Sequence, residues 1–350
     1  MEKKLGELTF KEINQQPEVF KGVSDDIENI CGKVKDIFEN FKPEEIIFVG
    51  CGTSHYLAQS AVSIFSHYNN IPARAAVASE IFLNGDSYFK GQRVLMVPIT
   101  RASSTTEVRM AIKAAKSRPN VATLAVTCDI GSAEINDYYL LSPKAEDKSV
   151  VMTSTYTSML YLILVMSLCL AGKEEELNKI KAYPEISASF MDRVNEQVKA
   201  IVDENKDIKL FICLGQGSMY GVANEAMLKI KEMTISNSEA YHSLEYRHGP
   251  ISLVEKDVFT LLFVTENAKE YELKLAKEIK ELGGKVAIIC SNADEKTNSV
   301  GDYVIELKDS LDDYLRTPLS IIPVQLLALH FASSKGMDVD SPRNLSRAIV

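Results

Sequence analysis

The chain contains the run Ile46-Ile47-Phe48-Val49-Gly50-Cys51-Gly52-Thr53-Ser54, in which four apolar residues precede a glycine-rich turn. The apolar residues are typical of a buried strand. The two glycines and the hydroxyl side chains after them are typical of a tight turn that leads into a helix, which we expect to end near His67. A strand, a glycine turn and a helix form the first half of a βαβ unit, which predicts a parallel sheet.

The same order of elements continues outward from this run. Residues 1–40 have helical spacing of apolar residues, and a further apolar helix is expected around 323–334. After the run, we predict strands at 73–77, 94–99, 121–127 and 138–141, and helices at 105–116 and 152–171. Strands that alternate with helices predict an α/β fold with helices on both faces of a parallel sheet.

A second copy of this pattern follows at an offset of about 163 residues, which indicates internal duplication. The run Phe48–Gly52 corresponds to Phe211–Gly215, and three further matches pair 94–100 with 258–264, 121–129 with 286–294, and 137–138 with 302–303. We therefore predict two tandem, doubly wound, flavodoxin-like domains. The expected boundaries are a helical segment at 1–27, domains at 28–180 and 195–337, and an exposed tail at 338–350.

Composition excludes several classes of protein. The chain has 350 residues, 46% of them hydrophobic, and a net charge of −9, which describes a globular protein and argues against a nucleic-acid surface. The most apolar run, 159–171, is too short to span a bilayer, and the polar start lacks a signal peptide. Six dispersed cysteines predict reduced thiols in a cytoplasmic protein, and the histidine spacing predicts no metal site.

Two loops of small and hydroxyl residues follow neighbouring predicted strands. They are residues 50–54 and the sequence Thr100-Arg101-Ala102-Ser103-Ser104-Thr105-Thr106, and Thr153-Ser154-Thr155 stands at a third helix start. Ligands of open parallel sheets bind at such helix starts, where amides and hydroxyls suit a phosphate monoester. The same residues also cap helices that bind nothing. Nucleotide binding is a weaker alternative, because Gly50-x-Gly52 lacks a third glycine.

A stretch that begins at Glu225 gathers acids, bases and two histidines. Glu225, Lys229 and Glu232 fall on one face of a predicted helix, and His248 follows in a segment that Gly249-Pro250 interrupts. A carboxylate and an imidazole brought together can transfer protons near neutral pH. The alternative is structural, with an ordinary i,i+4 ion pair, a solvated Glu232 and a histidine in a turn.

Together these motifs resemble the double sugar-isomerase (SIS) domain proteins. The chain is most similar to the isomerase half of glucosamine-6-phosphate synthase and to free-standing amino-sugar-phosphate deaminases and isomerases. The resemblance runs from about residue 25 to the C-terminus. It rests on Cys51-Gly52-Thr53-Ser54, the loop at Thr100, Glu232 with Glu245-Tyr246-Arg247-His248-Gly249-Pro250, and Pro342-Arg343-Asn344-Leu345.

The resemblance implies a hexose 6-phosphate or hexosamine 6-phosphate substrate and no cofactor. His248 would assist opening of the sugar ring, Glu232 would move a proton between C1 and C2, and Lys229 would lie beside Glu232. A homodimer is implied, with His248 reaching the neighbouring subunit's site. The substrate-binding residues implied are Cys51, Gly52, Thr53, Ser54, Thr100, Arg101, Ala102, Ser103, Thr105, Val151 and Thr153.

Three residues depart from the family's pattern. Ala102 and Ser103 stand where the family has serine and glycine, and Arg347, an implied catalytic residue, stands where the synthase has lysine. Arginine cannot act as a neutral amine. No glutaminase motif is present in the first 40 residues, so we expect deamination and isomerisation of a hexosamine 6-phosphate without glutamine. Alternatives are a fructosamine-6-phosphate deglycase, a ketose–aldose isomerase and a non-catalytic sugar-phosphate sensor.

Overall fold

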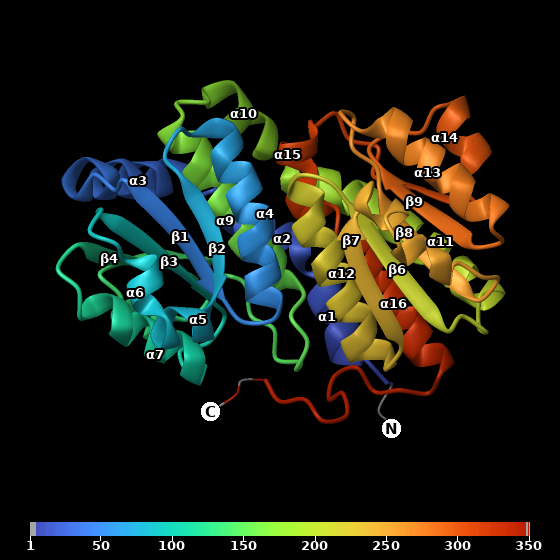
Figure 1. Ribbon diagram of the computed structural model, residues 1–350, viewed down its shortest axis with the longest axis horizontal. Helices are drawn as coiled ribbons and strands as arrows, with labels where there is room; N and C mark the ends of the chain where they lie inside the picture. Colours follow the sequence, from blue (N-terminus) through green and yellow to red (C-terminus); the bar gives the residue numbers. More distant parts are fainter. Residues whose placement is uncertain (1–4, 348, 350) are drawn as a thin grey trace. The chain divides into compact units, whose positions relative to one another are not determined.

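The computed structural model describes residues 5–347 and 349, which form two compact units. The first domain comprises residues 15–147 and 154–184, with Ser346, Arg347 and Ile349 of the tail. The second domain comprises residues 5–14, 148–153 and 185–345. Each domain has a five-stranded sheet among the described residues (Figure 1).

The first sheet has the strand order β2-β1-β3-β4-β5, and all of its pairings are parallel. This is the order of flavodoxin-like folds. The strands are β1 (Glu45–Gly50), β2 (Ala73–Val77), β3 (Val94–Thr100), β4 (Val121–Thr127) and β5 (Tyr138–Leu141). The strands expected at these places are therefore confirmed.

Helices cover both faces of the first sheet. Ile47 of β1 packs with Ile81 of α5 and Ile112 of α7 on one face, whereas Phe48 meets Phe65 of α4 edge-to-face on the other, with ring centroids 6.0 Å apart. Alternate residues of one strand thus enter two separate cores. The helices are α2 (Gln16–Ser24), α3 (Ile27–Phe41), α4 (Thr53–Tyr68), α5 (Ala78–Leu83), α6 (Gly85–Tyr88), α7 (Thr106–Lys116), α8 (Ile130–Glu134), α9 (Ser154–Leu170) and α10 (Glu174–Ile180).

The second sheet repeats this topology in the order β7-β6-β8-β9-β10. Its parallel strands are β6 (Leu210–Gly215), β7 (Asn237–His242), β8 (Val258–Phe263), β9 (Lys285–Cys290) and β10 (Tyr303–Glu306). Two copies of one strand order confirm the predicted fold class of tandem doubly wound domains.

The offset predicted for the first repeat match is wrong by two residues. A Cβ on Gly50 would lie 2.4 Å from the carbonyl carbon of Ser54, and one on Gly215 would lie 2.3 Å from the carbonyl oxygen of Met219. Gly52 and Gly217 share a positive φ, of 51° and 56°. The glycines that the turn requires therefore correspond at an offset of 165, whereas the predicted pairing matched apolar letters.

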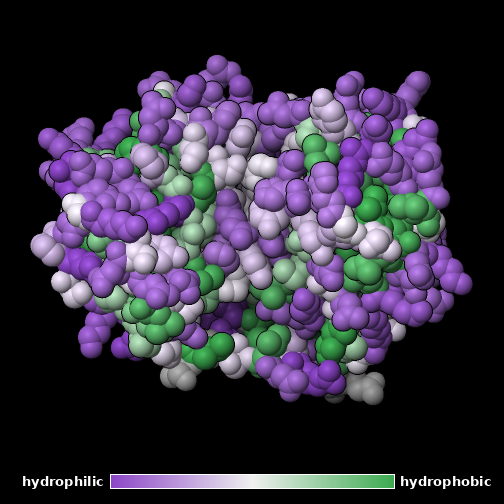
Figure 2. Space-filling model, viewed as in Figure 1, coloured by the Kyte–Doolittle hydropathy of each residue, from purple (hydrophilic) through white to green (hydrophobic). Residues whose placement is uncertain are grey.

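A long apolar segment of the second domain is buried. Residues 313–334 are long and apolar enough to cross a membrane by length and composition. In this structure Phe331 packs edge-to-face on Phe211 of β6, 5.1 Å between centroids. On the face drawn in Figure 2, hydrophilic residues predominate and apolar residues form separate small patches. The second-domain helices are α1 (Glu7–Asn14), α11 (Tyr183–Glu204), α12 (Ser218–Thr234), η1 (Glu245–Arg247), η2 (Pro250–Leu253), α13 (Lys269–Glu281), α14 (Glu295–Val300), α15 (Asp313–Arg316), η3 (Thr317–Leu319) and α16 (Ile322–Ser334).

The tail is not exposed along its whole length, contrary to expectation. Val339 is buried, and the backbone N–H and hydroxyl of Thr9 each donate to Asp340 Oδ1 at 2.8 Å. A buried carboxylate that accepts such bonds fixes the chain locally, because leaving it unpaired would be costly. The tail is thus held to α1 as far as residue 340.

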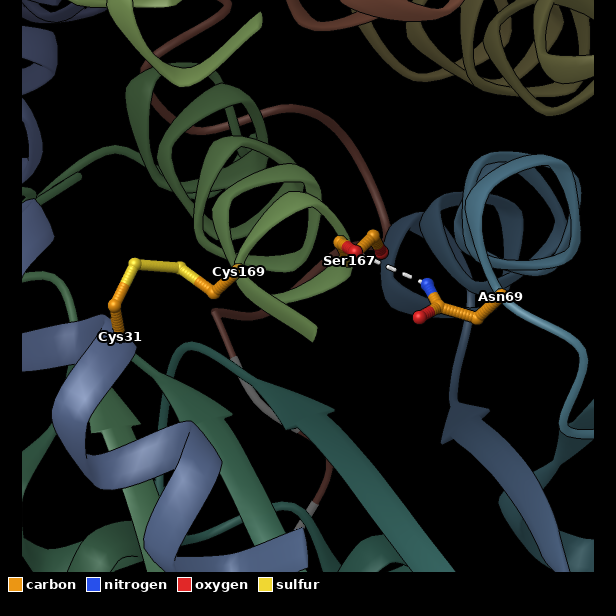
Figure 3. The surroundings of a disulfide bond; sticks show 4 residues. All are labelled: Cys31, Asn69, Ser167 and Cys169. Atoms are coloured by element: carbon orange, nitrogen blue, oxygen red, sulfur yellow. Dashed lines mark hydrogen bonds between the residues drawn. A yellow bond between two sulfur atoms is a disulfide. The ribbon is translucent and has the colours of Figure 1, made fainter. Parts of the chain in front are cut away.

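Two cysteines form a disulfide, so the prediction that all six are reduced is wrong for Cys31 and Cys169. The bond joins α3 to α9 across 138 residues of sequence, with the Cα atoms 5.3 Å apart (Figure 3). Beside it, the Asn69 side chain donates to the carbonyl of Ser167 at 3.0 Å. Sequence could not give this pairing, because spacing alone does not specify which cysteines meet.

Candidate functional site

The turn after β1 brings α4 close against the end of its strand. Any side chain at Gly50 would collide with the backbone of Ser54, and Gly52 adopts φ +51°, so both positions require glycine. The result is that Thr53 and Ser54, each 5% exposed, lie in the first turn of α4 at the carboxyl end of β1. Cys51 accepts the N–H of Ser54 at 3.1 Å.

The loop after β3 is held by hydrogen bonds within the loop and from outside it. Thr100 Oγ1 donates to the carbonyl of Ala102 at 2.8 Å, and the N–H of Ser103 donates to Asp129 Oδ2 at 2.7 Å. Partial burial would raise the pKa of Asp129, but bonds from Ser103, Gly131 and Ser132 outweigh it and hold this pKa below its usual value. Asp129 therefore stays charged and fixes the loop.

Ser103 occupies its position without backbone strain. Ser103 is not one of the described residues whose φ is positive. The family's glycine is thus not required for the conformation that this loop adopts. The helix α7 that follows has Thr105 as its N-cap residue.

The C-terminal tail reaches the start of α7. Arg101 Nη2 donates to the carbonyl of Arg347 at 3.0 Å, and the N–H of Thr106 donates to the carbonyl of Ile349 at 3.1 Å. Arg101 is 9% exposed, whereas Arg347 is exposed. An implied binding residue and an implied catalytic residue are therefore brought together within the first domain.

A pocket of about 800 Å³ opens beside this loop at the carboxyl ends of β3, β4 and β5. Its lining carries two guanidinium groups and three carboxylates, so a ligand there meets charges of both signs. The residues are Arg101, Ala102, Ser104, Cys128, Asp129, Ile130, Leu141, Pro143, Ala145, Glu146, Asp147, Thr155 and Arg347. This size lies in the range usual for small-molecule sites.

Asp147 organises the start of α9 at the rim of this pocket. The hydroxyl of Ser154 donates to Asp147 Oδ1 at 2.7 Å and the N–H of Thr155 to Oδ2 at 3.0 Å. Asp129 and Asp147 were not selected from the sequence. An Asp followed two residues later by glycine could have indicated Asp129 as a helix cap, but no local pattern marks Asp147.

Val151 and Thr153 belong to the second domain. The carbonyl of Val151 accepts the hydroxyl of Ser149 at 3.0 Å, and that of Thr153 accepts Gln325 Nε2 at 3.3 Å. Glu12 of α1 accepts the N–H of Ser149 at 3.0 Å. Both implied binding residues thus lie in a segment fixed through its backbone.

The acid–base cluster on α12 is largely buried. Lys229 Nζ lies 3.5 Å from Glu225 Oε1 and also bonds to Glu232. The side chains of Glu225 and Lys229 are 0% and 1% exposed, but that of Glu232 is 20% exposed. Glu232 is therefore the member of this cluster that a solute can reach while Lys229 holds it in place.

His248 stands in an irregular segment of the same domain. The segment is anchored just before His248 by buried Tyr246 and by Arg247, whose Nε donates to Glu278 Oε2 at 2.8 Å. His248 itself is exposed, and Gly249 after it has φ +123°. Within residues 5–347 and 349 no hydrogen bond joins His248 to Glu232, so the described chain does not unite these two groups.

In the second domain, a carboxylate lies against the loop that corresponds to the loop after β3. The corresponding loop after β8 contains Thr265, whose N–H and hydroxyl donate to Glu272 Oε2 at 2.8 and 3.2 Å. Ser243 Oγ donates to the other oxygen at 2.8 Å. Burial raises the pKa of Glu272 to about 7 although these bonds lower it. An internal carboxylate thus accepts the hydrogen bonds of Thr265, which also lines a pocket of about 170 Å³ beside this loop.

We expect Glu272 to make folding stability depend on pH. Its folded-state pKa of about 7 exceeds the ordinary glutamate pKa of 4.5. The stability contributed by its proton is therefore complete below pH 4.5 and lost as pH rises to 7. The test compares the free energy of unfolding of the natural chain with that of Glu272→Gln. The difference, natural chain minus variant, should fall by about 1–3 kcal/mol between pH 5 and pH 8. Urea melts measure this, with exposed Glu281→Gln on the same helix as control. A flat difference for Glu272→Gln contradicts the expectation.

No cluster of three metal-ligating side chains occurs among the described residues. His242 makes a different kind of contact, because it stacks on Tyr220 with ring centroids 3.7 Å apart and bonds to Gln216 at 3.0 Å.

Residues 206–335 match the family described as the SIS domain. The chain is 28% identical over 346 residues to the glutamine–fructose-6-phosphate aminotransferase (isomerizing) of Methanothermobacter thermautotrophicus. It is 29% identical over 358 residues to the protein of that name from Caldanaerobacter subterraneus. Each alignment takes in 97% of this chain, but the chain spans only 57% and 58% of the lengths of these relatives.

Solved structures share the fold along nearly the whole chain. A glucosamine-6-phosphate deaminase from Thermotoga maritima has a TM-score of 0.78 and 29% identity, covering 98% of this chain and 99% of that one. The C-terminal domain of the glucosamine-fructose-6-phosphate aminotransferase from Francisella tularensis has a TM-score of 0.81 and 23% identity, covering 96% and 98%. The second likeness concerns the fold alone.

Proposed function

We propose, from the premise that this chain is a SIS-domain protein, that it deaminates and isomerises a hexosamine 6-phosphate to a ketose 6-phosphate. The observation that carries the proposal is the cluster on α12. Glu232 reaches solvent while buried Lys229 holds it, which is what a positioned general base requires. The likeness to a glucosamine-6-phosphate deaminase supports the substrate class.

In the proposed reaction, His248 assists opening of the sugar ring and Glu232 removes the proton from C2 of the open-chain aldosamine. Return of that proton to C1 leaves an imine at C2. Water adds to this imine, and ammonia leaves with formation of the ketose. Hexosamine 6-phosphate and water thus give ketose 6-phosphate and ammonia. A proton α to a carbonyl or imine carbon is acidic enough for a carboxylate to take.

The phosphate is proposed to bind at the helix starts of the first domain. Ser54 in the first turn of α4 and Thr105 at the N-cap of α7 lie where helix amides favour anions. Arg101 adds a cation that is nearly buried. In this proposal Thr100, Ala102 and Ser103 shape the loop between them.

We also propose a homodimer in which His248 completes the neighbouring subunit's site. His248 is exposed on an anchored segment and makes no bond to Glu232 within the described chain, which supports a role away from its own α12. Mixing an inactive Glu232→Gln chain with an inactive His248→Ala chain should restore part of the activity, because some mixed dimers contain one intact site.

A second candidate function is cleavage of a fructosamine 6-phosphate. The pocket of about 800 Å³, with guanidinium groups and carboxylates in its lining, offers room and charges for an amine substituent beyond the sugar. Arg347 and Asp129 could engage such a substituent on either side. This observation favours the deglycase over a simple ketose–aldose isomerase.

The test is ammonia release from glucosamine 6-phosphate and galactosamine 6-phosphate, with fructose 6-phosphate isomerisation followed in the same samples. Ammonia together with a ketose phosphate supports the deaminase. Amine release from a fructosamine 6-phosphate, without ammonia release, supports the deglycase. Silence in all assays, with a rise in thermal midpoint on adding fructose 6-phosphate, contradicts both and favours a sensor.

A further inference from the structure

The disulfide of the first domain borders an open pocket that the proposed reaction does not use. This pocket has a volume of about 660 Å³ and lies at the amino ends of β1, β2 and β3. Cys169 lines it together with Phe38, Ile71 and Leu170. The candidate phosphate loops follow the carboxyl ends of the strands, so the two pockets lie at opposite ends of the sheet.

The two sulfur atoms differ in their surroundings. Cys169 is 3% exposed but borders the pocket, whereas Cys31 is half-buried on α3. Attack at the Cys169 sulfur therefore suits a small molecule that enters the pocket, because a residue that is 3% exposed offers little surface to a protein-sized reductant. The volume suits a ligand about the size of a tripeptide.

A cation stands beside Cys31 on its helix. Lys35 lies one turn after Cys31, at i+4 on the same face, and also lines the pocket. Over the described ranges its ammonium group makes no ion pair. A nearby cation stabilises a thiolate, so Cys31 is the better leaving group of the two when the disulfide is attacked.

We propose that Cys31–Cys169 is a thiol-exchange site served by this pocket, with a low-molecular-weight thiol as its reactant. The small thiolate attacks Sγ of Cys169. A mixed disulfide forms on Cys169 and the electron pair of the broken bond leaves on Cys31 as a thiolate. A second small thiolate then attacks the mixed disulfide, which releases the oxidised small molecule and leaves both cysteines reduced. The chain gains two electrons, and two small thiols become one disulfide.

The other described cysteines are poor competitors for such a reagent. Burial, and for Cys51 also the carboxylate of Glu107, raises the pKa of Cys51 to about 11, and burial raises that of Cys128 to about 12. Cys213 and Cys290 are buried strand residues. A small thiolate exchanges only with a disulfide sulfur, and these free thiols give little thiolate to attack an oxidised reagent, so exchange should be selective for the disulfide pair.

The first experiment traps the mixed disulfide. The full-length Cys31→Ser chain is incubated with oxidised glutathione, and peptide mass mapping follows the adducts over time. We expect the adduct on Cys169 to form at least ~5-fold faster than on Cys51 or Cys128. Circular dichroism checks that the variant is folded. Equal rates at the three cysteines, or no adduct on Cys169, overturn the proposal.

A second pair of variants tests the route through the pocket. Ile71→Trp fills the pocket and should slow the adduct on Cys169 severalfold, whereas Met110→Trp, an exposed apolar residue on α7, should not. In the chain with both cysteines, Lys35→Gln should slow reduction by glutathione about two- to threefold at low salt. Lys33→Gln, on the same helix but away from Cys31, is its matched control. Unchanged rates in Ile71→Trp exclude the pocket as the route.

Reduction should also be visible as lost stability. A disulfide that closes a loop of 138 residues restricts the unfolded chain, so reduced glutathione should lower the thermal midpoint of the full chain by about 5–15 °C. A disulfide that glutathione leaves intact until denaturant is added overturns the proposal. These readouts need no sugar phosphate, so their outcome is independent of the proposed enzymatic activity.

Discussion

Glu232→Gln is expected to lower turnover of the hexosamine 6-phosphate by ~100-fold or more while sugar-phosphate binding is kept. Glutamine preserves the shape of the side chain and can still accept a bond from Lys229, but it cannot take a proton from carbon. The phosphate loops lie on other elements, so they should still bind the ligand. The effect should therefore appear in kcat, with little change in KM.

The measurement is steady-state kinetics with calorimetric binding of fructose 6-phosphate. Glu295→Gln, an exposed carboxylate in the first turn of α14, is the matched control and should behave like the natural chain. Full activity of Glu232→Gln contradicts the proposed mechanism. Lost binding together with lost turnover would assign Glu232 to the fold or to ligand binding instead.

Lys229→Met is expected to reduce the free energy of unfolding by about 3–5 kcal/mol. Lys229 is 1% exposed and lies 3.5 Å from Glu225, whose side chain is 0% exposed. Methionine fills a similar volume but leaves that carboxylate buried without its cation. Removing one member of a buried ion pair is costly, whereas replacing both members is often nearly neutral.

Urea denaturation of the matched double variant separates charge from packing. Glu225→Gln combined with Lys229→Met removes both charges, so it should regain most of the stability lost in Lys229→Met. A single variant within about 1 kcal/mol of the natural chain would contradict an energetically important pair.

The fold was largely predictable because its signals are local. The apolar residues before Gly50 and the requirement for glycine at Gly50 and Gly52 specify strand, turn and helix within nine residues. The same pair of glycines recurs in the turn between β6 and α12, at Gly215 and Gly217. The two-residue error in the offset arose because apolar residues exchange freely within strands, whereas the glycines have a steric reason to stay in place.

Features that depend on distant partners could not be predicted. β7 has the polar sequence Asn237-Ser-Glu-Ala-Tyr-His and is not among the strands predicted from the sequence. An edge strand has one neighbour and a partly exposed face, so its sequence can be polar. The partner of Cys169 is 138 residues away. The interaction of Glu272 with Thr265 and Ser243 likewise joins three elements, so no sequence window contains it.

The placement of the candidate site is intermediate between these cases. The i,i+4,i+7 spacing correctly predicted that Glu225, Lys229 and Glu232 share one face of α12, because a helix fixes neighbours by spacing. Their burial was not predictable, since it depends on what packs against that face. The proposed binding and catalytic roles of the site residues remain predictions for the experiments above.

The carboxylate that closes the loop after β8 also bears on how the two halves of a duplicated gene can diverge. Glu272 satisfies the N–H and the hydroxyl of Thr265, so these two donors are constrained through folding. In the loop after β3 the internal carboxylate of Asp129 accepts the N–H of Ser103, whereas the proposed phosphate site uses Ser54, Thr105 and Arg101. We therefore expect random substitutions at Thr265 to change protein abundance, and random substitutions at Thr105 to change growth on the substrate.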